Sequence, residues 1–174
     1  MTPRLRPARA DDLGPVLDVF LACWRIAYQD LLPQPTLDAL TDDDATELWR
    51  RALADAGSRT LVAEHEGRVV GVVRWTPADA TVQSLYVHPG HQGQGTGATL
   101  LGAAADALAG EGAPTARLWV FAANAPAQAF YRRHGWVPDG ARRVEERFGA
   151  PELRLERTLE PTTMPTPVPT PEAP

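Results

Sequence analysis

The sequence predicts one α/β domain of the α+β type, in which helices flank a mixed, mostly antiparallel sheet of about six to seven strands. Three strand-forming segments follow one another over residues 60–88. A glycine-rich loop at residues 93–97 then leads into an apolar helix, and a strand, a short helix and further strands complete the pattern. The length of 174 residues suits a single hydrophobic core. We therefore expect residues 1–159 to form one domain.

The first third of the chain is expected to be mainly helical. Residues 4–9 can form a short first strand, after which Asp11 and Asp12 favour the start of a helix that runs to about residue 30. Apolar side chains recur at helical spacing along that segment. A second helical stretch is expected over residues 37–54. The Thr and Asp residues at 41–44 offer a new N-cap, so this stretch is either one helix or two.

The middle of the chain has the pattern of consecutive strands. Residues 60–65 and 68–75 are rich in strand-forming residues, and the Glu66-Gly67 pair between them is a hairpin signal. Residues 81–88 supply another strand, so we expect three antiparallel neighbours. An apolar helix at residues 98–108 follows and ends at a Gly-Glu-Gly sequence.

The next part of the chain repeats the order of strand and helix. Residues 117–122 form a predicted strand, and residues 125–134 form a short predicted helix that Gly135 ends. Residues 136–159 hold two more predicted strands joined around Gly149. The order of elements is therefore mixed α and β.

Residues 160–174 differ in composition from the rest of the chain. They are rich in Pro and Thr and cannot bury a core, so we expect a disordered tail. The alternative for this tail is a ligand for a proline-binding partner.

Composition and charge exclude several classes of protein. The formal net charge is -5 and no basic stripe is present, which argues against nucleic acid or an anionic membrane as a partner. No apolar run approaches the roughly 20 residues of a membrane span, and residues 1–12 lack the apolar stretch of a secretory signal. We therefore expect a cytoplasmic protein without membrane contact. The single cysteine, Cys23, cannot form an internal disulfide and is expected to be a buried, unreactive thiol.

The basic residues are all arginine, because the chain contains no lysine. A P-loop nucleotidase needs a phosphate-binding lysine, and a pyridoxal phosphate enzyme needs a lysine Schiff base. Both classes are therefore excluded. The four histidines are assigned surface or loop roles, and no metal site is predicted.

The glycine-rich loop has the features of an anion site. Residues without side chains let backbone amides approach a pyrophosphate, and the N-terminus of the following helix favours negative charge. The hydroxyl of Thr96 is a further donor. A dinucleotide-binding fold would also use such glycines, but it needs an acidic residue about 20 positions onward and more chain than remains. The candidate anion-binding residues are Gln92, Gly93, Gln94, Gly95, Thr96, Gly97 and Ala98.

A second motif begins at Asn124 and ends at Tyr131. Asn124 suits a helix N-cap and Pro126 suits the first helical turn, so capping alone explains part of this pattern. Capping leaves Phe130 and Tyr131 unexplained. Two core aromatic residues are the alternative to a functional pair.

The two motifs together resemble those of the GNAT superfamily of N-acetyltransferases. Residues 92–97 match the pattern Gln/Arg-x-x-Gly-x-Gly/Ala and follow the expected strand at residues 84–89. The second motif matches Asn-x-x-Ala-x-x-Phe-Tyr and stands before Gly135-Trp136. The resemblance covers residues 3–159 and is strongest over residues 81–136. It implies the GNAT fold and an N-acetyltransferase that uses acetyl-CoA as acyl donor.

The resemblance also implies roles for individual residues. The main chain around Tyr86, at Leu85 and Val87, would pair with the pantetheine arm of coenzyme A, while the loop amides would hold the pyrophosphate. Asn124 would contact pantetheine, and Tyr131 would protonate the coenzyme sulfur. A phenol with a reference pKa of about 10 is able to protonate a departing thiolate whose thiol pKa is about 8.5. A neutral amine would attack the thioester directly, without an acyl-enzyme.

The sequence indicates the residues that bind the acceptor less clearly than those that bind the acyl donor. Trp24 and Tyr28 lie one helical turn apart in a segment that borders the acceptor cleft of similar proteins, and they are either its apolar wall or core residues. Acidic residues at 42–47 and 145–146 favour a cationic acceptor, either a small amine or a protein N-terminus.

The proton acceptor is not identified by the sequence. Thr81 stands where several family members have a glutamate base. His88, Glu64 acting through water, or a chain of water alone remain open as the proton route. This gap keeps a second function open, a non-catalytic regulatory module that binds acyl-CoA. A homodimer that builds part of the acceptor cleft is also compatible with the sequence.

Overall fold

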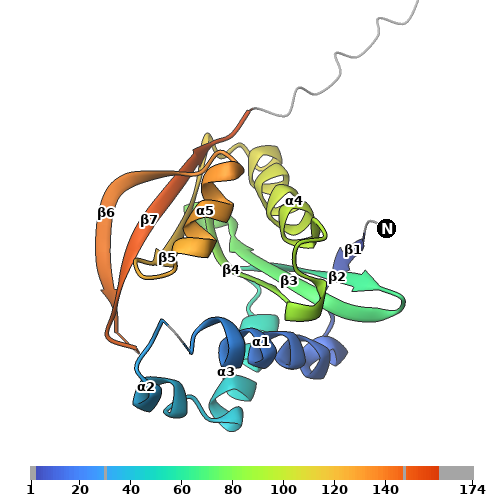
Figure 1. Cartoon of the computed structure of the whole chain (residues 1–174). Coiled ribbons are helices and arrows are strands. Elements are labelled where there is room, and N and C mark those ends of the chain that lie inside the picture. The colour runs from blue at the N-terminus through green and yellow to red at the C-terminus, as the bar shows by residue number, and fades with distance from the viewer. Residues whose placement is uncertain (1–2, 30, 147, 161–174) are drawn as a thin grey trace, which may run out of the picture.

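The computed structural model describes residues 3–29, 31–146 and 148–160, and the predicted tail lies outside them except for Glu160. One seven-stranded sheet carries helices on both faces, which confirms the predicted fold class (Figure 1). The strands are β1 (Arg4–Pro7), β2 (Arg59–His65), β3 (Arg68–Thr76), β4 (Thr81–Val87), β5 (Thr115–Phe121), β6 (Val137–Glu145) and β7 (Ala150–Thr158). The helices are α1 (Leu13–Ala27), α2 (Gln34–Asp38), α3 (Asp42–Ala54), α4 (Thr96–Gly110) and α5 (Ala125–Arg133), and the 3-10 helices are η1 (Ala10–Asp12), η2 (Pro77–Asp79) and η3 (Pro89–His91).

The sheet opens between its two central strands. The strand order is β1-β2-β3-β4-β5-β7-β6, and every neighbouring pair is antiparallel except β4 and β5. That parallel pair is short, since Thr81 pairs with Arg117 and Val82 with Leu118 but the register goes no further. Beyond Val82, the edge of β4 that faces β5 therefore has no strand partner within the described chain. Its main-chain groups are available to a ligand there, except the Val87 carbonyl, which accepts from the side chains of Gln92 and Cys23.

The stretch predicted at residues 37–54 consists of two helices, α2 and α3. The Thr41 hydroxyl accepts a hydrogen bond from the Asp44 amide at 3.1 Å, and the Asp44 carboxylate accepts one from the Thr41 amide at 3.2 Å. This reciprocal capping box begins α3 and separates it from α2. β1 is shorter than predicted and ends at Pro7, because η1 begins soon afterwards.

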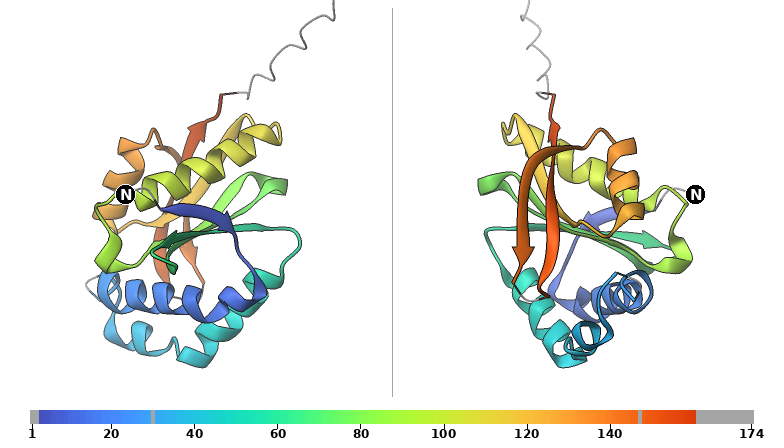
Figure 2. Two further views of the ribbon diagram at one scale, coloured as in Figure 1. Left: turned by 90° about the vertical axis from the view of Figure 1, so that its right-hand side faces the viewer. Right: turned by 60° about the vertical axis from the view of Figure 1, so that its left-hand side comes forward.

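Alternate residues of the central strands point into two separate cores. Val72 and Val73 of β3 are both fully buried, yet Val72 packs with α1 and α3 and Val73 packs with α4. Figure 2 shows the same division, with α1 and α3 below the sheet and α4 above it. A ligand lying between the diverging strands would therefore contact both faces of the sheet.

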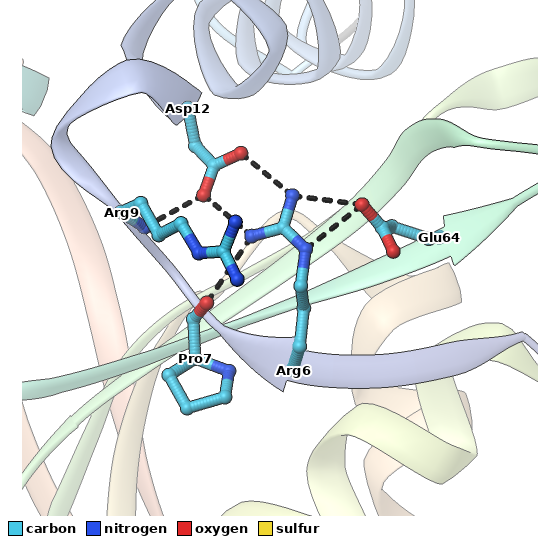
Figure 3. Close-up of polar contacts among 5 residues, drawn as sticks. All are labelled: Arg6, Pro7, Arg9, Asp12 and Glu64. Atoms are coloured by element: carbon cyan, nitrogen blue, oxygen red, sulfur yellow. Dashed lines mark hydrogen bonds and ion pairs between the residues drawn. The ribbon is translucent and has the colours of Figure 1, made fainter.

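Charged contacts of Arg6 join β1 to β2 and η1 (Figure 3). The guanidinium donates to both carboxylate oxygens of Asp12, at 2.7 and 2.8 Å, and its Nε donates to Glu64 at 2.8 Å. Asp12 also accepts from the Arg9 amide at 2.6 Å. These hydrogen bonds, chiefly the one from Arg6, lower the pKa of Asp12 below its ordinary value.

We expect Asp12→Ala to lower the free energy of unfolding by about 3 kcal/mol. The substitution removes one of the two carboxylates that pair with the largely buried guanidinium of Arg6. The folded-state pKa of Asp12 lies below the unfolded value of about 3.9, so its contribution is fully present above that pH and is lost as the pH falls through the folded pKa. Urea unfolding at neutral pH and at about pH 3 measures both effects. The exposed neighbour Asp11→Ala is the control and should change stability little. Equal losses in the two variants would contradict the role given to the Arg6 contacts.

Candidate active site

A cavity of about 750 Å³ lies where β4 and β5 diverge. Its wall includes residues from both faces of the sheet, namely the α1 side and the α4 and α5 side. Most predicted site residues line it: Trp24, Tyr28, Leu85, Tyr86, Val87, Gln92, Gly93, Gly95, Gly97, Ala98, Asn124 and Tyr131. Sequence segments that are far apart in the chain are thus brought to one cavity.

The glycine loop forms a cradle at one end of the cavity. Gly93 and Gly95 have φ angles of 72° and 85°, a left-handed conformation that favours glycine, and a Cβ at either position would meet no atom within 4 Å. The space above them is therefore open. Gly95 is the N-cap of α4 and has no side chain to cap the helix, so the first N–H groups of α4 are left for an anion.

The side chains of three predicted loop residues contact other parts of the protein, and two of them do not line the cavity. Thr96 is only 4% exposed and does not line the cavity, and its methyl group lies close to Gly71 of β3. Gln94 is also off the cavity wall, and its side chain donates to the Gly90 carbonyl at 3.4 Å. The Gln92 side chain donates to the Val87 carbonyl at 2.9 Å and so ties the loop to the end of β4.

The Val87 carbonyl has a second donor, the Sγ of Cys23 at 3.1 Å. Burial raises the pKa of the Cys23 thiol to about 11, so it stays protonated near neutral pH. A protonated, buried thiol is a poor nucleophile, although it lines the cavity. The unreactive role predicted for Cys23 agrees with this environment.

Helix α5 brings Asn124 and Tyr131 to the cavity. The Oδ1 of Asn124 accepts a hydrogen bond from the Ala127 amide at 3.1 Å, so the residue is an N-cap as predicted. The Tyr131 ring contacts Phe130 and Trp136, with ring centroids 5.3 and 6.3 Å apart. Burial raises the pKa of the Tyr131 phenol above its ordinary value. The hydroxyl is therefore a proton donor over the whole neutral range.

Aromatic rings line the part of the cavity on the α1 side of the sheet, which we call the aromatic end. The Trp24 ring contacts those of Tyr28 and Phe148 in tilted arrangements, with centroids 4.9 and 4.8 Å apart, and the Phe121 centroid lies 5.7 Å from that of Tyr28. Burial, with a smaller effect of the neighbouring Tyr86, raises the pKa of Tyr28 well above its ordinary value. Trp24 and Tyr28 thus belong both to the cavity wall and to a hydrophobic core.

Three further residues at this end were not singled out by the sequence: Phe121, Phe148 and Glu152. Phe121 ends β5 and pairs in register with Glu152 of β7. The pairing of β5 with β7 has no local signal in the sequence. These residues become neighbours only in the folded sheet.

The residues considered for the proton route lie elsewhere in the structure. Glu64 accepts from Arg6, and the Nδ1 of His88 accepts from the Gly90 amide at 3.2 Å. Neither lines the cavity, and the same holds for Thr81. In the described part of the chain, no three His, Cys, Asp or Glu side chains come close enough together to hold a metal ion. Among the same residues, every helix is too short or too polar to span a membrane.

Comparisons with known proteins agree with this arrangement. Residues 21–136 match the model of the acetyltransferase (GNAT) family, which is more than half of the chain. The uncharacterised N-acetyltransferase YuaI of Bacillus subtilis (strain 168) is 27% identical over 175 residues, covering 89% of this chain and 96% of that protein. A GCN5-related N-acetyltransferase of Rhodopseudomonas palustris superposes with a TM-score of 0.78 at 23% identity, covering 91% of this chain and 97% of the other. The PaiA N-acetyltransferase of Thermoplasma acidophilum, solved with coenzyme A, has a TM-score of 0.73 at 17% identity, with coverages of 91% and 99%.

The fold and the family match together define an acyltransferase with an open, mixed sheet. The chain belongs to the acetyltransferase (GNAT) family, as its two motifs implied.

Proposed function

We propose that this protein transfers the acetyl group of acetyl-CoA to a primary amine of a small molecule or of a protein N-terminus. The observation that carries the proposal is the cavity between β4 and β5. One end has the uncapped N-terminus of α4, and the other end has aromatic rings and a carboxylate. A phosphate-bearing donor and an amine-bearing acceptor would therefore meet between the two strands.

The residues at the α4 end fit coenzyme A. The N–H groups of residues 93–98 would hold its pyrophosphate. The His88 amide donates to Val70 of β3 at 2.9 Å, so alternate residues of β4 bond to β3 and the intervening Leu85 and Val87 face the open edge. Their main-chain groups would hydrogen-bond the pantetheine amides, except that the Val87 carbonyl already accepts from Gln92. Acetyl-CoA supplies an activated thioester when it is bound there.

Direct attack by the amine fits the side chains of the cavity. Cys23 is buried and protonated, so no acyl-enzyme is expected. Tyr131 would give its proton to the departing thiolate, and the amide side chain of Asn124 would contact the pantetheine arm. Leu85 and Val87 would orient the donor in a ternary complex with the amine.

We further propose that residues 1–159 are the catalytic unit, because the seven strands and both cores of the described chain lie within this range. A cytoplasmic location is proposed as well. The single cysteine is buried as a free thiol, which fits a reducing compartment.

The test is thiol release from acetyl-CoA with a mixed panel of amines, run beside a calorimetric titration with coenzyme A. We expect micromolar binding of coenzyme A and release that depends on the amine. Binding without release by any amine would favour a regulatory acyl-CoA-binding module. Failure to bind coenzyme A would overturn the proposal.

A further inference from the structure

A buried carboxylate stands at the aromatic end of the cavity. Glu152 lies in β7, in register with Phe121 of β5 on one side and Arg143 of β6 on the other. Its side chain is only 9% exposed, yet it forms part of the cavity wall. Phe121 is the last residue of β5, so Glu152 lies near the wide end of the gap between β4 and β5.

The charge of Glu152 is only partly compensated. The Nε of Arg143 donates to Oε2 at 2.6 Å, and that guanidinium also lies 4.3 Å above the centre of the Trp119 ring. No other hydrogen bond to the Glu152 carboxylate is found within the described residues. Arg143 is 48% exposed, so much of its charge is solvated. Burying a carboxylate is costly unless it is paired and hydrogen-bonded, and the lone pairs that Arg143 does not use are able to accept from a second cationic donor.

The surroundings of Glu152 suit a cation carried by an apolar group. Four charged side chains of the described residues line the cavity: Arg133 comes from α5, on the α4 side, whereas Arg143, Glu145 and Glu152 come from β6 and β7. Glu145 already accepts from the Phe148 amide at 2.8 Å. The rings of Trp24, Tyr28, Phe121 and Phe148 also belong to the cavity wall. Aromatic faces attract both flat apolar groups and ammonium ions.

We propose that Glu152 binds the ammonium group of the acceptor and takes its proton, and that the acceptor is a primary amine on a short linker from an aromatic group. This inference rests on the proposed acetyl transfer and names its acceptor class. The ammonium ion gives one proton to the Glu152 carboxylate. The freed nitrogen forms the bond to the acetyl carbon as the carbon–sulfur bond breaks, and the thiolate takes the proton of Tyr131. The second nitrogen proton returns to the Tyr131 phenolate, and Glu152 releases its proton to solvent.

The experiment compares the wild type with Glu152→Gln and with the control Glu156→Gln. Glu156 lies on the same strand and is part-exposed, but it does not line the cavity. Three acceptors are used near neutral pH: 2-phenylethylamine, which is a cation with a ring, phenylhydrazine, which is neutral with a ring, and ethanolamine, which is a cation without one. Amine binding is measured without acetyl-CoA by calorimetry and tryptophan fluorescence, and kcat/KM is measured by thiol release.

We expect Glu152→Gln to weaken binding of 2-phenylethylamine, and to lower its kcat/KM, by about 30-fold or more. Phenylhydrazine and coenzyme A should bind as in the wild type, which excludes a general loss of structure. Ethanolamine should be a poor acceptor for all three proteins. The proposal is overturned if Glu152→Gln matches Glu156→Gln, or if it loses binding of phenylhydrazine equally.

The measurement of amine binding without acetyl-CoA separates this inference from the proposed function. If 2-phenylethylamine binds to the wild type through Glu152 but no thiol is released with any amine, the carboxylate site stands and acetyl transfer fails. If amines are acetylated with no dependence on Glu152, acetyl transfer stands and the Glu152 inference fails.

Discussion

Tyr131→Phe is expected to lower kcat by about 100- to 1000-fold, because general-acid catalysis contributes factors of this size. The substitution keeps the ring that packs against Phe130 and Trp136, so the fold and the binding of acetyl-CoA should be preserved. The loss should therefore appear in kcat, with little change in the KM for acetyl-CoA. Thiol-release assays over a range of acetyl-CoA concentrations that reaches saturation measure the two parameters separately.

The pH dependence of the wild type gives a second check on Tyr131. Burial raises its pKa above the ordinary value of about 10, so the phenol keeps its proton as the pH rises to that value. We expect no loss of kcat from ionisation of this group up to about pH 10. Tyr86→Phe is the control, since it removes another buried phenol of the same cavity. A kcat for Tyr131→Phe equal to that of the wild type would remove the phenol from the mechanism.

The fold could be predicted where its signals are local. The hairpin between β2 and β3 turns at Glu66 and Gly67, whose φ angles of 50° and 77° are those that such a two-residue turn requires. The position of β7 between β5 and β6 could not be predicted, because strand order depends on contacts between distant segments. The short register of β4 with β5 has no sequence signal either. That register produces the cavity.

The candidate site, like the fold, could be predicted where its signals are local in the sequence. The glycine loop and the motif from Asn124 to Tyr131 are contiguous, so their residues could be named together, and most of them line the cavity. Glu152 was missed for a physical reason. It alternates with Leu153 and Leu155, and a period of two assigns such a glutamate to a solvated face. Both faces of β7 are covered, since Leu153 and Leu155 pack on the α4 side and Ala150 packs on the α1 side.

The two faces of the sheet also explain how the donor and acceptor roles separate. The residues proposed to bind the donor belong to the loop, to the edge of β4 and to α5, whereas the aromatic wall belongs to α1 and the β5 to β7 region. The gap beyond Val82 joins the two. A substitution in the loop should therefore reduce coenzyme binding and leave amine binding intact.

Gly95→Val is expected to weaken coenzyme A binding by at least about 100-fold, equivalent to about 2.7 kcal/mol. A β-branched residue at a φ of 85° is strained, so the loop would shift and its N–H groups would no longer converge on one anion. The new side chain would also enter the open space of the cradle. Charge-assisted hydrogen bonds contribute about 1.5–3 kcal/mol each, so losing one or two accounts for the effect. Calorimetric titration with coenzyme A measures it.

Gly112→Val is the matched control for this substitution. Gly112 has a φ of 86°, its Cβ position is equally open, and it follows α4 at the end away from the loop. Both variants should lose about 1–3 kcal/mol of stability from backbone strain, but only Gly95→Val should lose coenzyme A. Amine binding in the absence of coenzyme should stay at the wild-type level in both. If the two variants lost coenzyme affinity equally, strain alone would account for the result and the loop would have no special part in holding the pyrophosphate.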